Sequence, residues 1–250
     1  MKKSVIIICL SLLSVALSAQ QQSLGVQIGF DRPLIRENNI TTTNKLGTPT
    51  SANGFKVGLV YDASLVKGFG FSLGVNYNLA ANKSAWTQES TNFTAKKRQT
   101  SDLIQTIEIP IDWQYKFSIA QQTYLILYSG PVIQYNFMFK HSVSHKNEVD
   151  NTLSTDIYNH YSADNQYDNG SKYADRDQDN KADYSPLNLQ WSIGAGFQYK
   201  NYFLRGGYNF GIYNHYKDQY YTNPDGTTEY RMRGRWDEWN IRVGIYFLNF

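Results

Sequence analysis

Two adjoining segments of the chain, residues 187–199 and 202–212, alternate between bulky apolar side chains and small or polar ones. In the first segment Trp191 and Phe197 fall on one face, whereas Ser192 and Gly194 fall on the other. A period of two is the signature of a β-strand, and each segment is about as long as a tilted strand that crosses a bilayer. The bulky face suits a protein core or lipid. The small and polar face suits solvent or the inside of a narrow barrel.

The same alternation recurs along the chain and predicts eight strands, whose connections run long, short, long, short, long, short, long. Bacterial outer-membrane barrels have short periplasmic turns, long external loops and an even number of strands. We therefore predict an all-β fold, an eight-stranded antiparallel up-and-down transmembrane β-barrel. A soluble β-sandwich or lipocalin-like barrel is the alternative, but neither explains the order of the connections. The strands are expected at residues 24–30, 55–61, 69–79, 103–117, 124–139, 187–199, 202–212 and 239–247.

The remaining segments are expected to be loops, because they are polar and show no period. The long loops are predicted at residues 31–52, 81–101, 141–185 and 214–234.

In the fifth strand the alternation is expected to change phase at residues 129–131.

The N-terminus has the pattern of a cleaved secretory signal peptide. Lys2 and Lys3 precede an apolar run at residues 5–17, and Ala19 offers a cleavage point before Gln20. We predict a signal peptide at residues 1–19 and a single outer-membrane β-barrel domain at residues 20–250, with cleavage after Ser18 as a neighbouring alternative. The formal net charge is +3, and two of the lysines belong to the signal peptide. The near-neutral mature chain argues against a nucleic-acid partner.

Several motifs resemble the porin-like outer-membrane β-barrel family of small eight-stranded proteins. They are GFSLGVNYN at residues 70–78, IEIPIDWQYKF at residues 107–117, YSGP at residues 128–131 and SIGAGFQYKNYFLRGGYNFGI at residues 192–212. The resemblance covers residues 20–250 and implies location in the bacterial outer membrane. The family includes secretion-associated barrels and has no shared reaction. The terminal Phe250 resembles the signal that barrel-assembly machinery recognises, which makes that machinery an expected partner.

Charged residues fall on the faces that we assign to the lumen. An eight-stranded barrel has an interior that side chains can just fill, and unpaired ions in a dry interior are costly. We expect opposite charges to pair there and to plug the barrel, with a narrow ion path or gated pore as the alternative. The predicted lumen charge network consists of Lys56, Glu108, Asp112, Lys116, Arg205, Glu238 and Arg242.

An acidic run in the third long loop is a candidate calcium site, because calcium prefers several carboxylate oxygens in a flexible loop. The run departs from the EF-hand pattern at Asn180 and Pro186, so a solvated acidic loop is the alternative. No other cofactor is expected. The candidate metal ligands are Asp175, Asp177, Asp179 and Asp183.

An enzymatic role is not expected. His141 and His145 would share a zinc ion only on a helix, which the intervening Ser142, Val143 and Ser144 do not favour. Serines and aspartates lie near these histidines, but no spacing marks a nucleophile and its base.

The external loops are the expected place of function. The loop at residues 141–185 is rich in Tyr, Asn and Asp, a composition suited to binding surfaces, with a flexible polar cap as the alternative. The loop at residues 214–234 has a basic aromatic rim that suits lipopolysaccharide phosphates. It includes Tyr216, Tyr220, Tyr221, Tyr230, Arg231 and Arg233. Interfacial aromatic girdles are expected at Tyr61, Trp113, Tyr115, Tyr199, Tyr202, Trp236 and Trp239.

The sequence thus predicts a non-catalytic outer-membrane protein with a structural or interaction role and surface-displayed loops. The alternatives are a small passive pore and an accessory barrel of a secretion or assembly complex. Outer-membrane lipid, lipopolysaccharide and a protein bound at the external loops are the expected partners.

Overall fold

The computed structural model of the chain describes residues 21–39, 50–91, 94–161, 184–216, 220–222 and 229–249. The predicted signal peptide and Phe250 lie outside these residues. Among the described residues there is no helix with the length and apolar character needed to cross a membrane.

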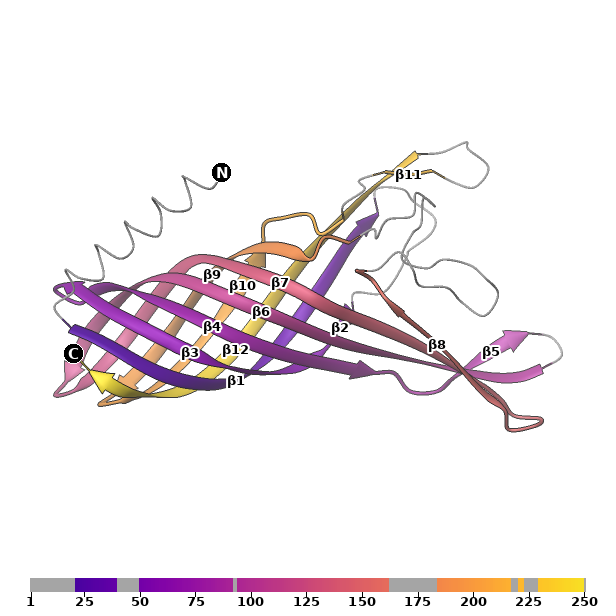
Figure 1. The fold of residues 1–250 in the computed structure, drawn as a ribbon, viewed down its shortest axis with the longest axis horizontal. Coiled ribbons are helices and arrows are strands. Elements are labelled where there is room, and N and C mark those ends of the chain that lie inside the picture. The colour runs from indigo at the N-terminus through magenta and orange to yellow at the C-terminus, as the bar shows by residue number, and fades with distance from the viewer. Residues whose placement is uncertain are drawn as a thin grey trace.

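Eight antiparallel strands form a closed ring (Figure 1). Their order is β1-β3-β4-β6-β7-β9-β10-β12, and β12 pairs with β1 to complete the circle. The predicted fold class and number of barrel strands are therefore confirmed. The ring strands are β1 (Gln21–Asn39), β3 (Asn53–Val66), β4 (Phe69–Lys83), β6 (Thr94–Ala120), β7 (Thr123–Asn147), β9 (Leu187–Tyr199), β10 (Tyr202–Gly211) and β12 (Glu229–Asn249).

Four shorter strands lie within the segments predicted as long loops. They are β2 (Thr50–Ser51), β5 (Thr87–Thr91), β8 (Leu153–Asn159) and β11 (Tyr220–Thr222), which pair with β1, β6, β7 and β12 respectively. The segments predicted as long loops therefore contain strands in part, and β6 and β7 stay paired as far out as Lys96 and Asn147. Beyond the bilayer neither face of a strand needs to be apolar, so the sequence loses its period while backbone hydrogen bonds continue.

The short connections lie at one end of the barrel. The turns contain Lys67 and Gly68, Gln121 and Gln122, and Lys200 and Asn201. Gly68 has a φ of 87°, a backbone conformation that glycine adopts without strain. The start of β1 and the end of β12 lie at this end as well (Figure 1), which is the periplasmic end in bacterial barrels.

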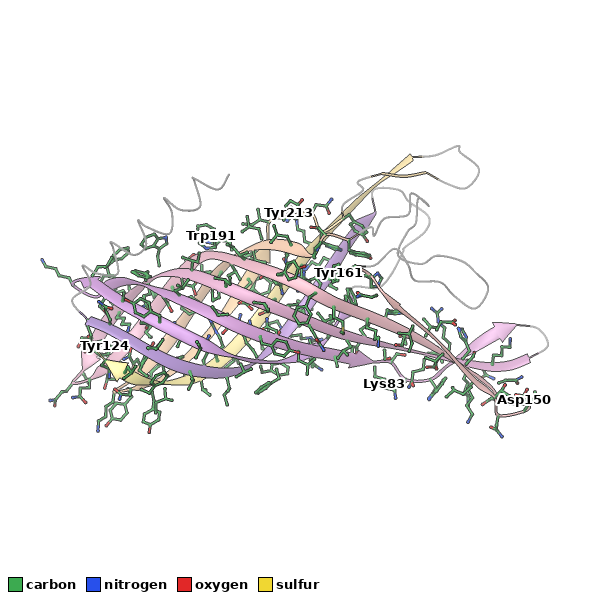
Figure 2. All side chains as sticks on the ribbon, viewed as in Figure 1. Lys83, Tyr124, Asp150, Tyr161, Trp191 and Tyr213 are labelled. Carbon is green, nitrogen blue, oxygen red and sulfur yellow. The ribbon has the colours of Figure 1, made fainter. Side chains whose placement is uncertain are left out.

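The barrel wall has an apolar outside and a polar inside. Ile193 and Phe197 on the outer face are 54% and 43% exposed, whereas Lys56 and Asn76 on the inner face are completely buried. Trp191 projects from the outer face of the wall (Figure 2). This arrangement is the reverse of a soluble core and fits a barrel surrounded by hydrocarbon.

The predicted phase change in β7 is misplaced. Ile126 and Tyr128 point into the lumen and are almost fully buried, whereas Leu125 and Leu127 are 42% and 46% exposed on the outside. The register between β6 and β7 instead shifts farther along β7. Gln105 pairs with Met138 and the next residue, Thr106, pairs with Asn136, so one residue of β7 is skipped. Apolar residues occupy both faces in this part of β7, so the alternation alone assigns the wrong face to the lumen.

Candidate functional site

The lumen is the candidate functional site, because charged side chains from four strands, β3, β6, β10 and β12, meet in it. Glycines on the inner face make room for large side chains. At Gly194 and Gly207, on adjacent strands β9 and β10, the hydroxyl of Tyr128 occupies the space that a Cβ atom would need. These two positions therefore let Tyr128 reach across the inner wall.

Lys56 of β3 is the centre of the first charge cluster. Its Nζ lies 2.5 Å from Glu108 Oε2 of β6 and 2.5 Å from Glu238 Oε1 of β12. Asn78 Nδ2 donates a further hydrogen bond of 2.8 Å to Glu108. The Lys56 side chain is completely buried and the two carboxylates are almost so. Three of the predicted lumen charges thus meet at one point, although they come from distant parts of the chain.

Asp62 of β3 is the centre of a second cluster, nearer the periplasmic end. Its Oδ2 lies 2.7 Å from Arg205 Nη2 and 3.1 Å from Lys116 Nζ, and it accepts a hydrogen bond of 2.5 Å from the Tyr246 hydroxyl. Arg205 also donates to the Ser72 hydroxyl at 2.9 Å. The sequence prediction included Arg205 and Lys116 but missed Asp62.

A simple signal would have found Asp62. The inward face of the second predicted strand contains Lys56, Gly58 and Val60, and the next residue of the same parity is Asp62. The predicted strand ends at residue 61, one residue before Asp62, whereas β3 continues as far as Val66.

Asp112 and Arg242 lie in the lumen but have no ion-pair partner within 4.0 Å among the described residues. Asp112 accepts a hydrogen bond from the Ser192 hydroxyl, and Arg242 Nη2 donates to the Tyr128 hydroxyl at 3.3 Å. Both side chains are buried. Each of these two charges is therefore contacted by a hydroxyl group instead of by an opposite charge.

An aromatic and aliphatic cluster lies beyond the Lys56 cluster, toward the external end. It contains Trp236, Phe139, Ile104 and Ile35. The rings of Phe139 and Trp236 meet edge to face, with centroids 6.1 Å apart. The prediction of Trp236 as an interfacial girdle residue is wrong, because it is 1% exposed and shares the inward parity of Glu238.

The lumen widens at the periplasmic end. A cavity of about 590 Å³ lies there, lined in part by Ser23, Ser64, Lys116 and Gln198. Its inner limit is Asp62, which belongs to the ion-pair cluster with Arg205. The cavity is thus a vestibule that ends at buried side chains.

The histidines and serines of β7 point to opposite faces of the sheet. His141 lies on the inner face, where its Nδ1 is 2.5 Å from Asp102 Oδ1. Ser142 pairs with Ser101 on the outer face, and the Ser144 hydroxyl lies 3.0 Å from that of Thr155. A strand places successive side chains on opposite faces, so Ser142 and His141 do not form a nucleophile and base.

Outside the barrel, β5, β6, β7 and β8 form a projecting four-stranded sheet, defined here as residues 87–91, 96–103, 140–147 and 153–159. Figure 1 shows it extending away from the periplasmic end. The turn between β7 and β8 contains Asp150 (Figure 2). The Thr152 backbone N–H and hydroxyl donate to Asp150 at 3.0 and 2.8 Å, which lowers the pKa of this exposed carboxyl.

The candidate calcium ligands Asp175, Asp177, Asp179 and Asp183 lie outside the described residues. In the predicted basic rim, the side chains of Arg231 and Arg233 are likewise outside the described part. Tyr216 of that rim is described and is 3% exposed, in ring contact with Tyr184. Tyr216 therefore does not form part of an exposed rim.

The chain is similar to known outer-membrane barrels. The sequence model of the family described as the outer membrane protein beta-barrel domain matches residues 18–217. No curated protein matches the chain at a significant level.

Three solved structures illustrate the structural similarity. Ail, the attachment invasion locus protein of Yersinia pestis, solved with the heparin analogue sucrose octasulfate, is 10% identical; the match covers 91% of this chain and 99% of that chain, with a TM-score of 0.35. Neisserial surface protein A is 13% identical, over 89% and 97% of the two chains, with a TM-score of 0.33. The transport unit of the autotransporter AIDA-I from Escherichia coli is 13% identical, over 95% and 96%, with a TM-score of 0.37.

Proposed function

The chain belongs to the outer membrane protein beta-barrel domain family and resides in the bacterial outer membrane, and from this premise we propose that it is a non-catalytic protein with a structural or interaction role. The barrel anchors the chain in lipid, and the external loops with the projecting sheet face the cell surface. In this proposal residues 1–19 are removed on export, and residues 20–250 form one barrel domain.

The observation that carries the proposal is the closed lumen. Lys56 bridges Glu108 and Glu238 across the barrel, and Arg205 meets Asp62 one layer below. Each of these side chains is at most 2% exposed. A hydrated ion would have to displace paired charges in a low-dielectric interior, which is strongly unfavourable. The barrel therefore acts as a plugged scaffold instead of a passive pore.

Planar-bilayer recording tests the closed lumen. Refolded protein, inserted at known amounts, is expected to give no discrete conductance steps in symmetrical potassium chloride. A general porin measured in the same bilayers establishes that insertion is detectable. Steady, discrete openings from the wild-type chain would support the small passive pore instead.

A non-catalytic role is supported by the opposite orientations of His141 and Ser142. Incubation of the folded protein with phospholipid and with peptide substrates is expected to release no hydrolysis product. A product that disappears in a His141→Ala variant would establish an enzyme and contradict the proposal.

The interaction role is supported by the projecting sheet, which extends β6 and β7 well past the residues that contact lipid. Co-purification from native membranes in mild detergent, followed by mass spectrometry, is expected to identify a stable protein partner. Recovery of the chain alone, under conditions that preserve a known membrane complex, would leave only the structural role.

A further inference from the structure

The outer face of the projecting sheet forms ordered rows of side chains where the barrel leaves the bilayer. One row runs Lys83, Ser101, Ser142 and Ile157 across β4, β6, β7 and β8. The next row on the same face, one step closer to the membrane, contains Leu103 of β6 and Lys140 of β7, which are paired with each other. Lys83 and Lys140 are exposed, and the two serines are half-buried. Figure 2 shows Lys83 where the barrel meets the projecting sheet.

These four polar groups are placed to share one ligand. Rows on one face of a sheet are about 7 Å apart and adjacent strands about 4.8 Å apart. Lys83 and Lys140 therefore flank Ser101 and Ser142 at distances that two extended lysine side chains can span. Within the described part of the chain, neither ammonium group has an ion-pair partner and neither serine hydroxyl has a hydrogen-bond partner.

Two carboxylates of the sheet lie on its inner face, away from Lys83 and Lys140. Asp102 lies on the inner face with His141, and Asp156 lies on that face opposite the buried Val143. Farther out on the outer face, Lys97 pairs directly opposite Lys146, an arrangement of like charges that destabilises a sheet. Glu148 offsets only Lys97, with which it forms an ion pair. The outer face thus carries an excess of positive charge that no described protein group neutralises.

The position of this face identifies its ligand. Directly below it on the same face lie Leu79, Ile107 and Phe137, each more than a third exposed in the lipid-facing belt. A lipid whose acyl chains contact this belt places its headgroup against Lys83 and Lys140. Hydroxyl and ammonium groups together suit a phosphate, with the ammonium groups supplying the charge.

We propose that Lys83, Ser101, Lys140 and Ser142 form a binding site for a phosphate group of the phosphorylated glycolipid in the outer leaflet. The site lies where the end of β4 meets the projecting sheet, and not on the loop at residues 214–234. It depends on location in the outer membrane and does not require the closed lumen of the proposed function.

Binding to bisphosphorylated lipid A tests the site. The folded full-length mature chain is titrated with this lipid in detergent micelles, and bound lipid is quantified by native mass spectrometry. Each lysine near an anionic lipid surface contributes about a fivefold change in affinity. The Lys83→Gln/Lys140→Gln variant is therefore expected to bind about thirtyfold more weakly than the wild type. The uncharged change Ser101→Ala/Ser142→Ala is expected to give a smaller loss.

The matched control removes the same charge from the periplasmic end. Lys67→Asn/Lys200→Asn changes two turn lysines with φ values of 45° and 53°, a conformation that asparagine tolerates. This variant is expected to bind within about twofold of the wild type, since it is remote from the site. The different gel mobility of heated and unheated samples verifies that each variant is folded.

Four results would each overturn the proposal. The first is wild-type affinity in Lys83→Gln/Lys140→Gln, and the second is an equal loss in the periplasmic control, which would indicate a general charge effect. The third is equal binding of enzymatically dephosphorylated lipid A. The fourth is equally tight binding of a phosphorylated glycan without acyl chains, which would indicate a soluble polyanion. Because none of these readouts measures conductance, failure here is distinguishable from failure of the closed-lumen proposal.

Discussion

Arg205 of β10 and Asp62 of β3 meet inside the barrel at 2.7 Å, although 143 residues separate them in the chain. Neither side chain is more than 2% exposed. The Asp62 carboxylate also binds Lys116 and Tyr246, so one acidic residue holds together four strands of the wall. This convergence makes Asp62 the most informative single position for testing the interior.

Replacement of Asp62 by Asn is expected to destabilise the barrel strongly. The change leaves the buried Arg205 without a carboxylate, and loss of one partner of a buried ion pair costs about 3–5 kcal/mol. The free energy of unfolding is measured by urea titration, with the heat-modifiable gel band as the readout. The exposed turn residue Asp150 provides the control, since Asp150→Asn is expected to leave the free energy of unfolding close to that of the wild type. Equal stability of the two variants would contradict the role of Asp62.

Lys56 allows a test of whether the paired charges act as a unit. Lys56→Met leaves Glu108 and Glu238 together without a cation and is expected to cost about 3–5 kcal/mol. The triple change Lys56→Met/Glu108→Gln/Glu238→Gln removes all three charges and is expected to recover most of that loss. Both are measured by the same urea titration. A triple variant that is less stable than the single one would show that the charges stabilise the barrel independently.

Gly194 tests the close approach of Tyr128 to the inner wall. A Cβ atom at Gly194 would overlap the Tyr128 ring, so Gly194→Ala is expected to cost about 1–3 kcal/mol through overpacking. Gly206 is the matched control, because a Cβ atom there has no neighbour closer than 3.8 Å. Gly206→Ala is expected to leave stability unchanged or slightly improved. In a Tyr128→Ala background the overlap with the ring is absent, so Gly194→Ala is expected to cost less there than in the wild type. An equal cost in the two backgrounds would exclude this explanation.

Ile193 tests which face of the wall contacts lipid. It lies midway along β9 and is 54% exposed on the outer face. Ile193→Arg is expected to destabilise the barrel by about 2–4 kcal/mol in lipid bilayers, the cost of a cation near the bilayer midplane. Ile119 is equally exposed, at 59%, but lies beside the periplasmic turn, so Ile119→Arg is expected to cost about 1 kcal/mol or less. Equal effects at the two sites would mean that Ile193 does not face hydrocarbon.

The sequence was sufficient to predict the barrel because a strand that crosses a membrane must alternate. Hydrocarbon outside and a narrow polar lumen inside impose opposite requirements on successive residues. Ile193, exposed on the outer face, and its neighbour Ser192, buried on the inner face, are an example. The same constraint placed Lys56, Glu108 and Glu238 on the inner face. The prediction failed where this constraint ends. The outer parts of β6 and β7 are mostly polar on both faces, and their pairing follows from backbone hydrogen bonds that impose no alternation on the side chains.

The sequence was enough to predict the number of barrel strands, their approximate positions and the inward face of the seven predicted lumen charges, because alternation is a local property of the chain. Which of these charges meet, by contrast, depends on how the strands are assembled. Closure of the ring brings Lys56 to Glu238 and Asp62 to Arg205, since the register of all eight strands together sets the height of each residue in the lumen. The same registration aligned Lys83 with Ser101 and Ser142 on the outer face.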